Sequence, residues 1–188
     1  MKNFRKLFGK IGLSSSPKKS LTHKEREDNV CRIKDILLKI GRQGKEELIR
    51  HLEASSFFEI GCHRHHAYPG GLAEHSLEVY DMAFKLCENV EHDSIAIAAL
   101  LHDLGDIEGG QGHRSVDILE RWHFELSESE RRAIKYHMWK RHSSEDEEEF
   151  VIAKKDDLWR SITTADMISA GGYRCGGKIL KTMISLLA

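Results

Sequence analysis

The doublet His102-Asp103 constrains the fold more than any other feature, because it follows the longest apolar run of the chain, residues 95–101. Ala and Leu are strong helix formers and Gly105 is a stop signal, so the run predicts a buried helix that ends on an imidazole and a carboxylate. Charged side chains are rarely buried unless they are paired or bound to a metal. Taken alone, the doublet is better explained by an Asp that caps a loop and a His bonded to a backbone carbonyl. The rest of the chain reverses that preference.

Composition and spacing favour an all-α fold. The 188 residues are 40% hydrophobic and 31% charged, only two are Pro, and apolar residues recur at helical spacing. One domain with a sizeable core is the simplest expectation at this length. Four cysteines without CxxC pairing fit reduced, buried thiols of a cytoplasmic protein: Cys31, Cys62, Cys87 and Cys175.

The N-terminal segment differs in charge from the rest of the chain. Residues 1–24 hold seven Lys or Arg and no acid, and apolar residues at helical spacing make residues 1–13 a basic amphipathic helix: Phe4, Leu7, Phe8 and Ile11. Such a helix could touch an anionic membrane or a nucleic acid. Docking on its own domain, or fraying, is the favoured interpretation. We therefore divide the chain into an N-terminal segment and linker, residues 1–20, and a folded domain, residues 21–188.

The pattern predicts a succession of helices. Capping boxes start two of them, at Thr22 with Glu25 and at Ser127 with Glu130. Helices are expected over residues 22–40, 45–54, 72–86, 95–104, 113–122, 128–139, 156–170 and 179–187. The His-rich stretch 55–71 and the glycine-rich stretch 105–112 are expected to be irregular, and the acidic run 145–149 is expected to be a solvated loop.

Five of these elements place a His or an Asp on or near an apolar face. The residues are His75, His102 with Asp103, His113, His137 and Asp166. Burying one such group without a partner costs several kcal/mol, so independent burial in five elements is improbable for a marginally stable domain. A shared transition metal removes the difficulty, and mixed nitrogen and oxygen ligands suit Fe, Mn, Ni, Co or Zn. The sequence therefore predicts one or two divalent ions.

The motif order resembles a known family. His75, His102-Asp103 and Asp166, with the context Tyr-Pro-Gly-Gly-Leu-Ala-Glu-His over residues 68–75, are similar to the HD superfamily of metal-dependent phosphohydrolases across residues 60–170. The resemblance implies an all-helical bundle of about seven to eight helices in which these four residues bind one metal. Residues 65–68 and 112–113 resemble the branch that contains 3′-to-5′ exoribonucleases.

The resemblance also suggests a second ion and a set of residues that would contact substrate. His113 and His137 resemble the extra ligands of two-metal branches, in which Asp103 would bridge the ions. Many members carry a Lys where this chain has Asp106, so Asp106 could be the general acid or a solvated loop residue. His65 or His66, on the loop before the first ligand, could instead donate the proton or hold the phosphate, and the alternative is that both only support the ligands or lie at the surface. For phosphate binding we name His65, Arg64, Arg114 and Lys140, with Arg141 nearby.

Three functions remain open at this point. The favoured one is a hydrolase that cleaves a phosphoester of a nucleotide or a nucleic-acid end, by attack of a water whose pKa the metal lowers. The second is a metal-bound nucleotide-binding regulator without hydrolysis, for which Asp106 is the only hint. The third is a scaffold that recruits partners through its N-terminus. The partner implied by the first two is a phosphorylated small molecule or nucleotide, and nucleic acid is a further candidate.

Overall fold

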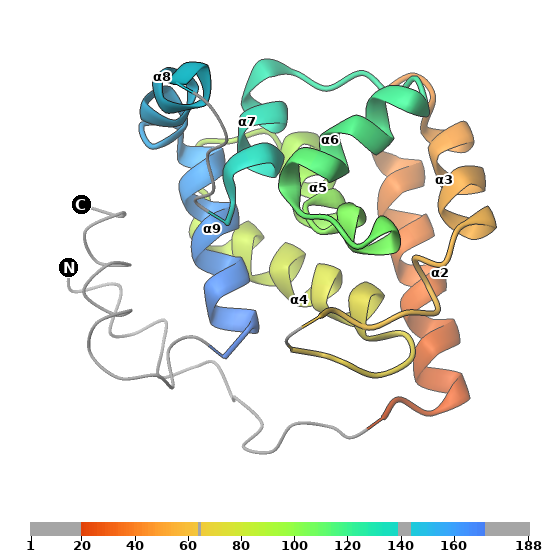
Figure 1. Cartoon of the computed structure of the whole chain (residues 1–188). Helices are drawn as coiled ribbons and strands as arrows, with labels where there is room; N and C mark the ends of the chain where they lie inside the picture. Colours follow the sequence, from red (N-terminus) through yellow and green to blue (C-terminus); the bar gives the residue numbers. More distant parts are fainter. Residues whose placement is uncertain (1–19, 64, 139–143, 172–188) are drawn as a thin grey trace.

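The computed structural model describes residues 20–63, 65–138 and 144–171. Within these ranges it contains α-helices, one 3-10 helix and no strand, so the prediction of an all-α fold with seven to eight helices is confirmed (Figure 1). The elements are α2 (His23–Lys39), α3 (Lys45–Ala54), α4 (Gly71–Leu86), α5 (His92–Leu101), η1 (Leu104–Glu108), α6 (Gly112–Arg121), α7 (Glu128–Tyr136), α8 (Ser144–Ala153) and α9 (Asp157–Ser169).

Local capping signals set several helix starts. Thr22 and Ser127 are N-caps with both capping-box bonds formed, as the sequence predicts. Asp156 caps α9 by accepting from the backbone N–H of Leu158 at 2.9 Å. Each cap satisfies backbone donors that would otherwise lack a partner at the first turn. The starts of α2, α7 and α9 are therefore encoded in a few neighbouring residues.

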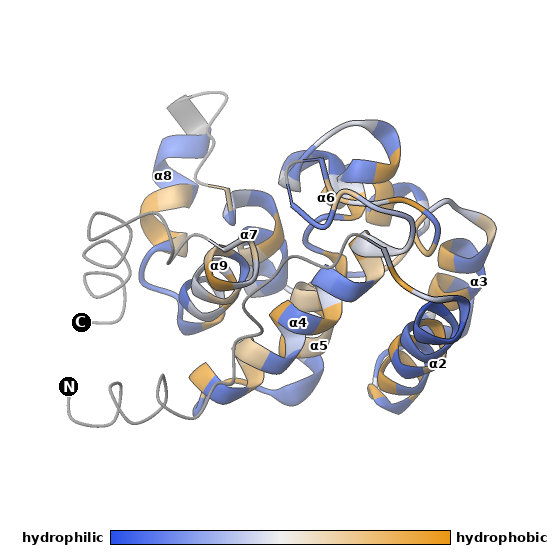
Figure 2. Cartoon of the chain, turned by 90° about the horizontal axis from the view of Figure 1, so that it is seen from below, coloured by the Kyte–Doolittle hydropathy of each residue, from blue (hydrophilic) through white to orange (hydrophobic). Residues whose placement is uncertain are grey.

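Helix α5 forms the centre of the core. All its residues from Ile95 to Leu101 are buried, and it packs against α4, α7 and α9. The outer helices α2 and α3 alternate hydrophilic and hydrophobic residues along their ribbons and lie on the opposite side of the molecule from α8 (Figure 2). A helix that is apolar all round belongs in an interior, whereas a striped helix belongs at a surface. None of the described helices combines the length and the hydropathy needed for a membrane span.

Three expectations are wrong. Part of the glycine-rich stretch 105–112 is helical, since η1 continues the chain directly after the doublet. The acidic run 145–149 lies within α8, and Asp146 is buried, because the Tyr136 hydroxyl donates to it at 2.8 Å and Lys135 Nζ lies 2.9 Å away. Cys31 is exposed and not buried. The predicted helices at residues 1–13 and 179–187, together with Cys175, lie outside the described residues, and no observation tests the division at residue 20.

The loop before α4 is packed tightly against two glycines. A Cβ on Gly71 would lie 1.9 Å from the carbonyl oxygen of His66, and one on Gly61 would lie 2.5 Å from the same oxygen. His66 itself has a positive φ of 49°, which is uncommon for a residue with a side chain. Gly61 and Gly71 thus let this loop approach α4 closely, and the loop brings His65 and His66 with it.

Candidate metal centre

All the predicted ligands except His113 converge, and they come from four segments of the fold. His75 comes from α4, His102 and Asp103 follow α5, His137 follows α7 and Asp166 comes from α9. His75 and His102 are fully buried, while His137 is 1% and Asp166 is 5% exposed. The residues are far apart in sequence, so tertiary packing alone brings them together.

Three of these side chains meet at one point. Nε2 of His75 lies 3.2 Å from Nε2 of His102 and 3.2 Å from Oδ1 of Asp166. Nε2 of His102 lies 3.9 Å from the same Asp166 oxygen. Ligands bonded about 2.1 Å from one ion lie roughly 3.0 to 3.4 Å apart in octahedral or tetrahedral geometry. The spacing of these atoms therefore suits one shared ion.

Asp103 faces two groups of ligands with its two oxygens. Oδ2 lies 3.5 Å from Nε2 of His75 and 3.5 Å from Nε2 of His102, whereas Oδ1 lies 3.1 Å from Nε2 of His137. A carboxylate that presents one oxygen to each of two nitrogen groups can bridge two cations. The arrangement is compatible with one ion or with two.

Hydrogen bonds at the outer ring nitrogens orient two of the imidazoles. His102 Nδ1 donates to the carbonyl of Ala99 and His137 Nδ1 donates to that of Ile134, each at 2.8 Å. In the neutral form that a metal ligand requires, an imidazole has only one N–H, so Nε2 of each of these two residues then carries a lone pair. Both lone pairs face the interior of the cluster, which is the orientation that a metal ligand requires.

The donor set fits a divalent transition metal. The Nε2 atoms of His75 and His102 lie 3.2 Å apart and are buried beside the carboxylates of Asp103 and Asp166, so a cation bound among these atoms would be favourably placed. Neutral imidazole and carboxylate are the ligands that Fe, Mn, Co, Ni and Zn share. The described residues His65, His75, Asp103 and Asp166 form one group whose ligand atoms all lie within 4.8 Å of one another. His102, His137 and Asp166 form a second such group.

The electrostatics of the cluster reflect mutual stabilisation of acids and imidazoles. Burial alone would raise the pKa of Asp103, but the neighbouring His102 and His137 outweigh it and lower that pKa. Burial would likewise lower the pKa of His137, but its contact with Asp103 outweighs this and raises the pKa to about 9. The pKa of His102 is lowered by burial. The acids are thus held as anions, which is the form that binds a cation.

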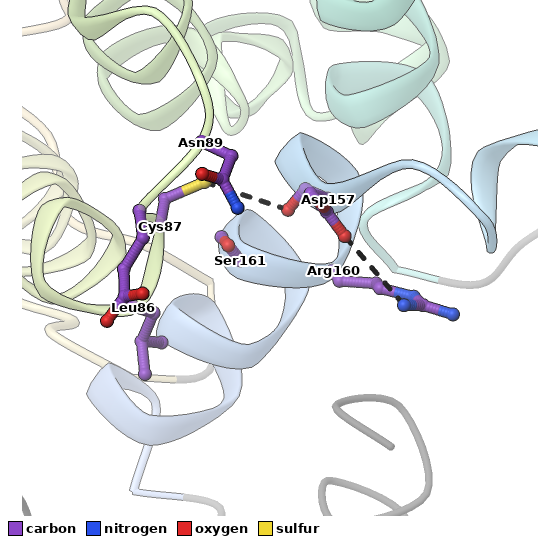
Figure 3. Close-up of a pocket in the computed structure, with 7 residues that line it drawn as sticks. Leu86, Cys87, Asn89, Asp157, Arg160 and Ser161 are labelled. Carbon is purple, nitrogen blue, oxygen red and sulfur yellow. Dashed lines mark hydrogen bonds and ion pairs between the residues drawn. The ribbon is translucent and has the colours of Figure 1, made fainter. Parts of the chain in front are cut away.

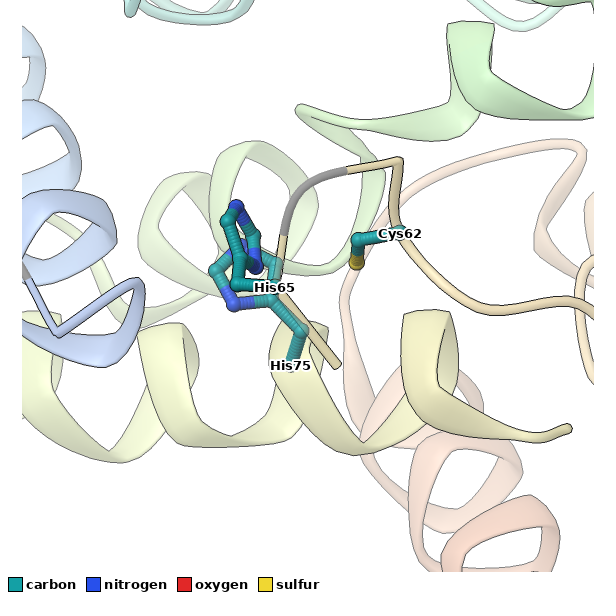
Figure 4. A group of neighbouring side chains, drawn as sticks. All are labelled: Cys62, His65 and His75. Atoms are coloured by element: carbon teal, nitrogen blue, oxygen red, sulfur yellow. The ribbon is translucent and has the colours of Figure 1, made fainter. Parts of the chain in front are cut away.

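The loop before α4 contributes three side chains. The His65 ring centroid lies 4.4 Å from that of His75, and burial followed by the nearby His75 lowers the pKa of His65 to about 4. Figure 4 shows His65 and Cys62 on this loop, beside His75 on α4. His66 Nε2 lies 3.2 Å from Oε2 of Glu78. Both histidines of the predicted pair therefore lie at or beside the cluster.

Asp106 also lies at the centre. Its carboxylate forms a group with Asp103 and the thiol of Cys62, with ligand atoms within 4.8 Å of one another. Burial and then the charge of Asp103 raise the pKa of Asp106 to about 6. Asp106 is thus an acid that lies beside the predicted ligands.

The remaining predicted residues are either outside the ligand groups or outside the described residues. His113 is in none of the ligand groups of the described residues, and its Nε2 lies 3.5 Å from Oδ1 of Asp146. Arg114 contacts Glu108 at 3.8 Å and Asp117 at 3.6 Å. Arg64 and Lys140, with Arg141, lie outside the described residues. The ligand role of His113 and the substrate role of these cations stay predictions.

Three residues of the centre are not among those that the sequence analysis predicted. Glu78 and Ser169 each follow a predicted ligand by three positions, so helical spacing from His75 and Asp166 could have indicated them. The third is Cys62, which is 2% exposed and precedes the histidine pair on the same loop. Its burial agrees with the expectation of a buried thiol, but its position beside the ligands could not be inferred from an irregular segment.

A pocket lies at the C-terminal end of α4 and the N-terminal end of α9, the ends away from His75 and Asp166. This pocket of about 220 Å³ is lined by Leu86, Cys87, Glu88, Asn89, Asp157, Arg160 and Ser161 (Figure 3). At 1.5 Å per residue along α9, Asp157 lies roughly 13 Å from Asp166. Its charged groups pair locally, since Arg160 lies 3.8 Å from Asp157. The pocket is therefore separate from the ligand cluster.

Comparison with known proteins identifies the class of protein. Residues 72–169, slightly more than half of the chain, match the HD domain family, and the chain belongs to that family. HD domains are helical and are generally metal-dependent hydrolases, which agrees with the fold and with the buried His and Asp groups. Neither the curated proteins nor the solved structures gave a match.

Proposed function

We propose that the protein is a metal-dependent phosphohydrolase that cleaves a phosphoester of a nucleotide or of a nucleic-acid end. The observation that carries this proposal is the convergence of His75, His102 and Asp166 on one point, with Asp103 beside them, inside a chain of the HD domain family. A divalent metal held there supplies Lewis acidity, which lowers the pKa of water and neutralises charge on phosphoryl oxygens. The choice of a nucleotide or nucleic-acid substrate rests only on the resemblance of the motif at residues 65–68 to that of 3′-to-5′ exoribonucleases.

The chain's own residues would bind and protonate the substrate. His65 and His66 lie on the loop that covers the cluster, where their ring N–H groups can donate to a phosphate oxygen. Asp106 lies beside Asp103 and is our candidate to protonate the leaving alkoxide, with His66 as the alternative. The phosphate-binding cations we propose are Arg64, Arg114 and Lys140.

Turnover of model esters by the full chain tests the proposal. Purified protein is first stripped of metal and then supplied with Mn²⁺ or Ni²⁺. Bis-p-nitrophenyl phosphate reports a diesterase and p-nitrophenyl phosphate a monoesterase. We expect metal-dependent turnover that His102→Ala abolishes. Bound metal without turnover of these esters, nucleotides or short oligonucleotides would contradict the proposal and favour a non-hydrolytic nucleotide-binding regulator.

Two further measurements separate the remaining alternatives. Deletion of residues 1–20 should leave turnover intact in a hydrolase, whereas a scaffold that recruits partners through this segment would lose its partners. The number of ions bound per chain distinguishes the two ligand schemes. A count near two supports a bridging Asp103, and a count near one leaves His113 and His137 as packing or hydrogen-bonded residues.

A further inference from the structure

His75 is held differently from the other two buried histidines of the cluster. His102 and His137 donate Nδ1–H to a backbone carbonyl three residues earlier on their own helix. Nδ1 of His75 instead lies 2.9 Å from the hydroxyl oxygen of Ser169 on α9. The Ser169 hydroxyl in turn donates to Oε2 of Glu78 at 2.6 Å. His75 is therefore oriented by two side chains, and those side chains come from two different helices.

The direction of these bonds fixes the tautomer of His75. A serine hydroxyl has one proton, and a carboxylate can only accept, so the Ser169 proton lies toward Glu78. The hydroxyl oxygen is then an acceptor toward His75, which donates its Nδ1–H. In the neutral ring that a metal ligand requires, Nε2 of His75 then carries the lone pair, and it points at Asp166 and His102.

We call the hydrogen-bonded chain His75–Ser169–Glu78 the relay. Glu78 also connects this relay to the loop that carries His66. Its Oε2 lies 3.2 Å from Nε2 of His66, and its side chain is 49% exposed. Burial would raise the pKa of Glu78, but His66 and Ser169 outweigh it and lower that pKa, so Glu78 is an anion that accepts from both. One carboxylate thus holds α4, the end of α9 and the histidine loop together.

We propose that Ser169 and Glu78 are positioning residues that set the tautomer of His75 and thereby tune the affinity of the centre for its cation. The inference rests on the proposed function, because it assigns these residues to the metal centre of that enzyme. Removal of a residue that orients a metal-bound histidine typically weakens metal binding roughly 10- to 100-fold. Here the carboxylate of Glu78 would orient His75 through the hydroxyl of Ser169.

Metal affinity of the full chain provides the first test. Competition with a chromophoric chelator gives the Kd for Zn²⁺ and for Mn²⁺. We expect Ser169→Ala and Glu78→Gln to weaken binding about 10- to 100-fold. Ser169→Thr, which keeps the hydroxyl, should restore affinity to within a few-fold of the wild type.

Matched controls remove the same groups from the same helices. Ser161→Ala removes another α9 hydroxyl at the remote pocket, and Asp81→Asn removes another α4 acid that pairs with Arg32. Both should bind metal as the wild type does. Thermal unfolding of the metal-free variants checks that each one folds. Glu78→Gln keeps the test valid if Ser169→Ala does not fold, because Glu78 is half exposed.

The ¹⁵N signals of the histidine rings give a second readout that needs no turnover. In the Zn²⁺-loaded wild type we expect His75 to show a protonated, slowly exchanging Nδ1, and in Ser169→Ala that proton should exchange faster. Unchanged affinity together with an unchanged His75 signal would overturn the relay. If the wild type binds no metal, the proposed function fails instead. The relay is then judged in the metal-free protein by whether Ser169→Ala changes the protonated nitrogen of His75.

Discussion

Two buried clusters of charged residues differ in how their acids are neutralised: the first is the candidate metal centre and the second is the cluster around Glu130. At the junction of α5, α7 and the loop before α3, Glu130 is fully buried and accepts from both Arg42 guanidinium nitrogens, at 2.7 and 3.1 Å, from Ser94 and from the backbone of Ser127. Its charge is neutralised by a side chain of the protein itself. Among the described residues, Asp103 and Asp166 pair with imidazoles and with no Lys or Arg.

The difference shows that burial of an acid does not by itself indicate a site. Glu130 is more deeply buried than Asp103, whose side chain is 13% exposed, yet every oxygen of Glu130 has a donor from the chain. The metal centre instead pairs its carboxylates with imidazoles, which carry no permanent charge. A divalent cation from solution would supply that charge, whereas the Glu130 cluster is a structural ion pair.

The largest effect is expected from Asp103→Asn. Asp103 touches both groups of imidazoles, and a metal typically supplies several kcal/mol of transition-state stabilisation, so turnover should fall on the order of 10³-fold. Phosphodiesterase assays and metal analysis measure the loss. The exposed Asp35→Asn should behave as the wild type. Normal turnover by Asp103→Asn would refute the assignment of the cluster as the active site.

Arg42→Met should be the most destabilising change in the second cluster. It leaves the Glu130 carboxylate buried without its cation, which costs about 3 kcal/mol. Urea unfolding gives the free energy. Arg32→Met breaks an exposed pair with Asp81 and should cost about 0.5 kcal/mol or less. Equal costs for the two variants would show that the Arg42–Glu130 pair is no more important than a surface contact.

Metal should stabilise the protein only by binding at the candidate metal centre. At a free metal concentration 100 times the Kd, binding adds about 2.7 kcal/mol to the free energy of unfolding. For a chain of this length that corresponds to roughly 5–10 °C in Tm. Thermal scans with Mn²⁺ and then with EDTA measure the shift. Arg42→Met should keep it and Asp103→Asn should lose it, so an equal shift in both would place the metal elsewhere.

The smallest expected effect is a pH dependence of the free energy of unfolding that comes from Glu130. Burial would raise the pKa of Glu130, but Arg42, Ser94 and the Ser127 backbone outweigh it and lower that pKa below its ordinary value of 4.5. The stabilisation is thus complete above pH 4.5 and is lost as the pH falls through the folded-state pKa. Glu130→Gln should be less stable than the wild type at neutral pH, with a gap that narrows below pH 4.5. A gap that widens in acid would contradict this sign.

Much of the fold follows from patterns within single elements. The capping boxes at Thr22 and Ser127, the apolar run of α5 and the boundaries of α3 agree with the structure because each depends on residues a few positions apart. The convergence of His75, His102 and Asp166 was indicated by the cost of burying each one alone. Spacing and composition were sufficient for these inferences.

Tertiary packing decided the features that depend on partners from other elements. Asp146 sits in an acidic run that predicts a solvated loop, yet Tyr136 and Lys135 of α7 allow it to be buried in a helix. The relay from His75 through Ser169 to Glu78 exists only because the end of α9 lies against α4. The sequence by itself determined most of the helices and which buried side chains need a partner. Only the packed structure decided which partner each receives, because hydrogen bonds across elements depend on distances that no local pattern encodes.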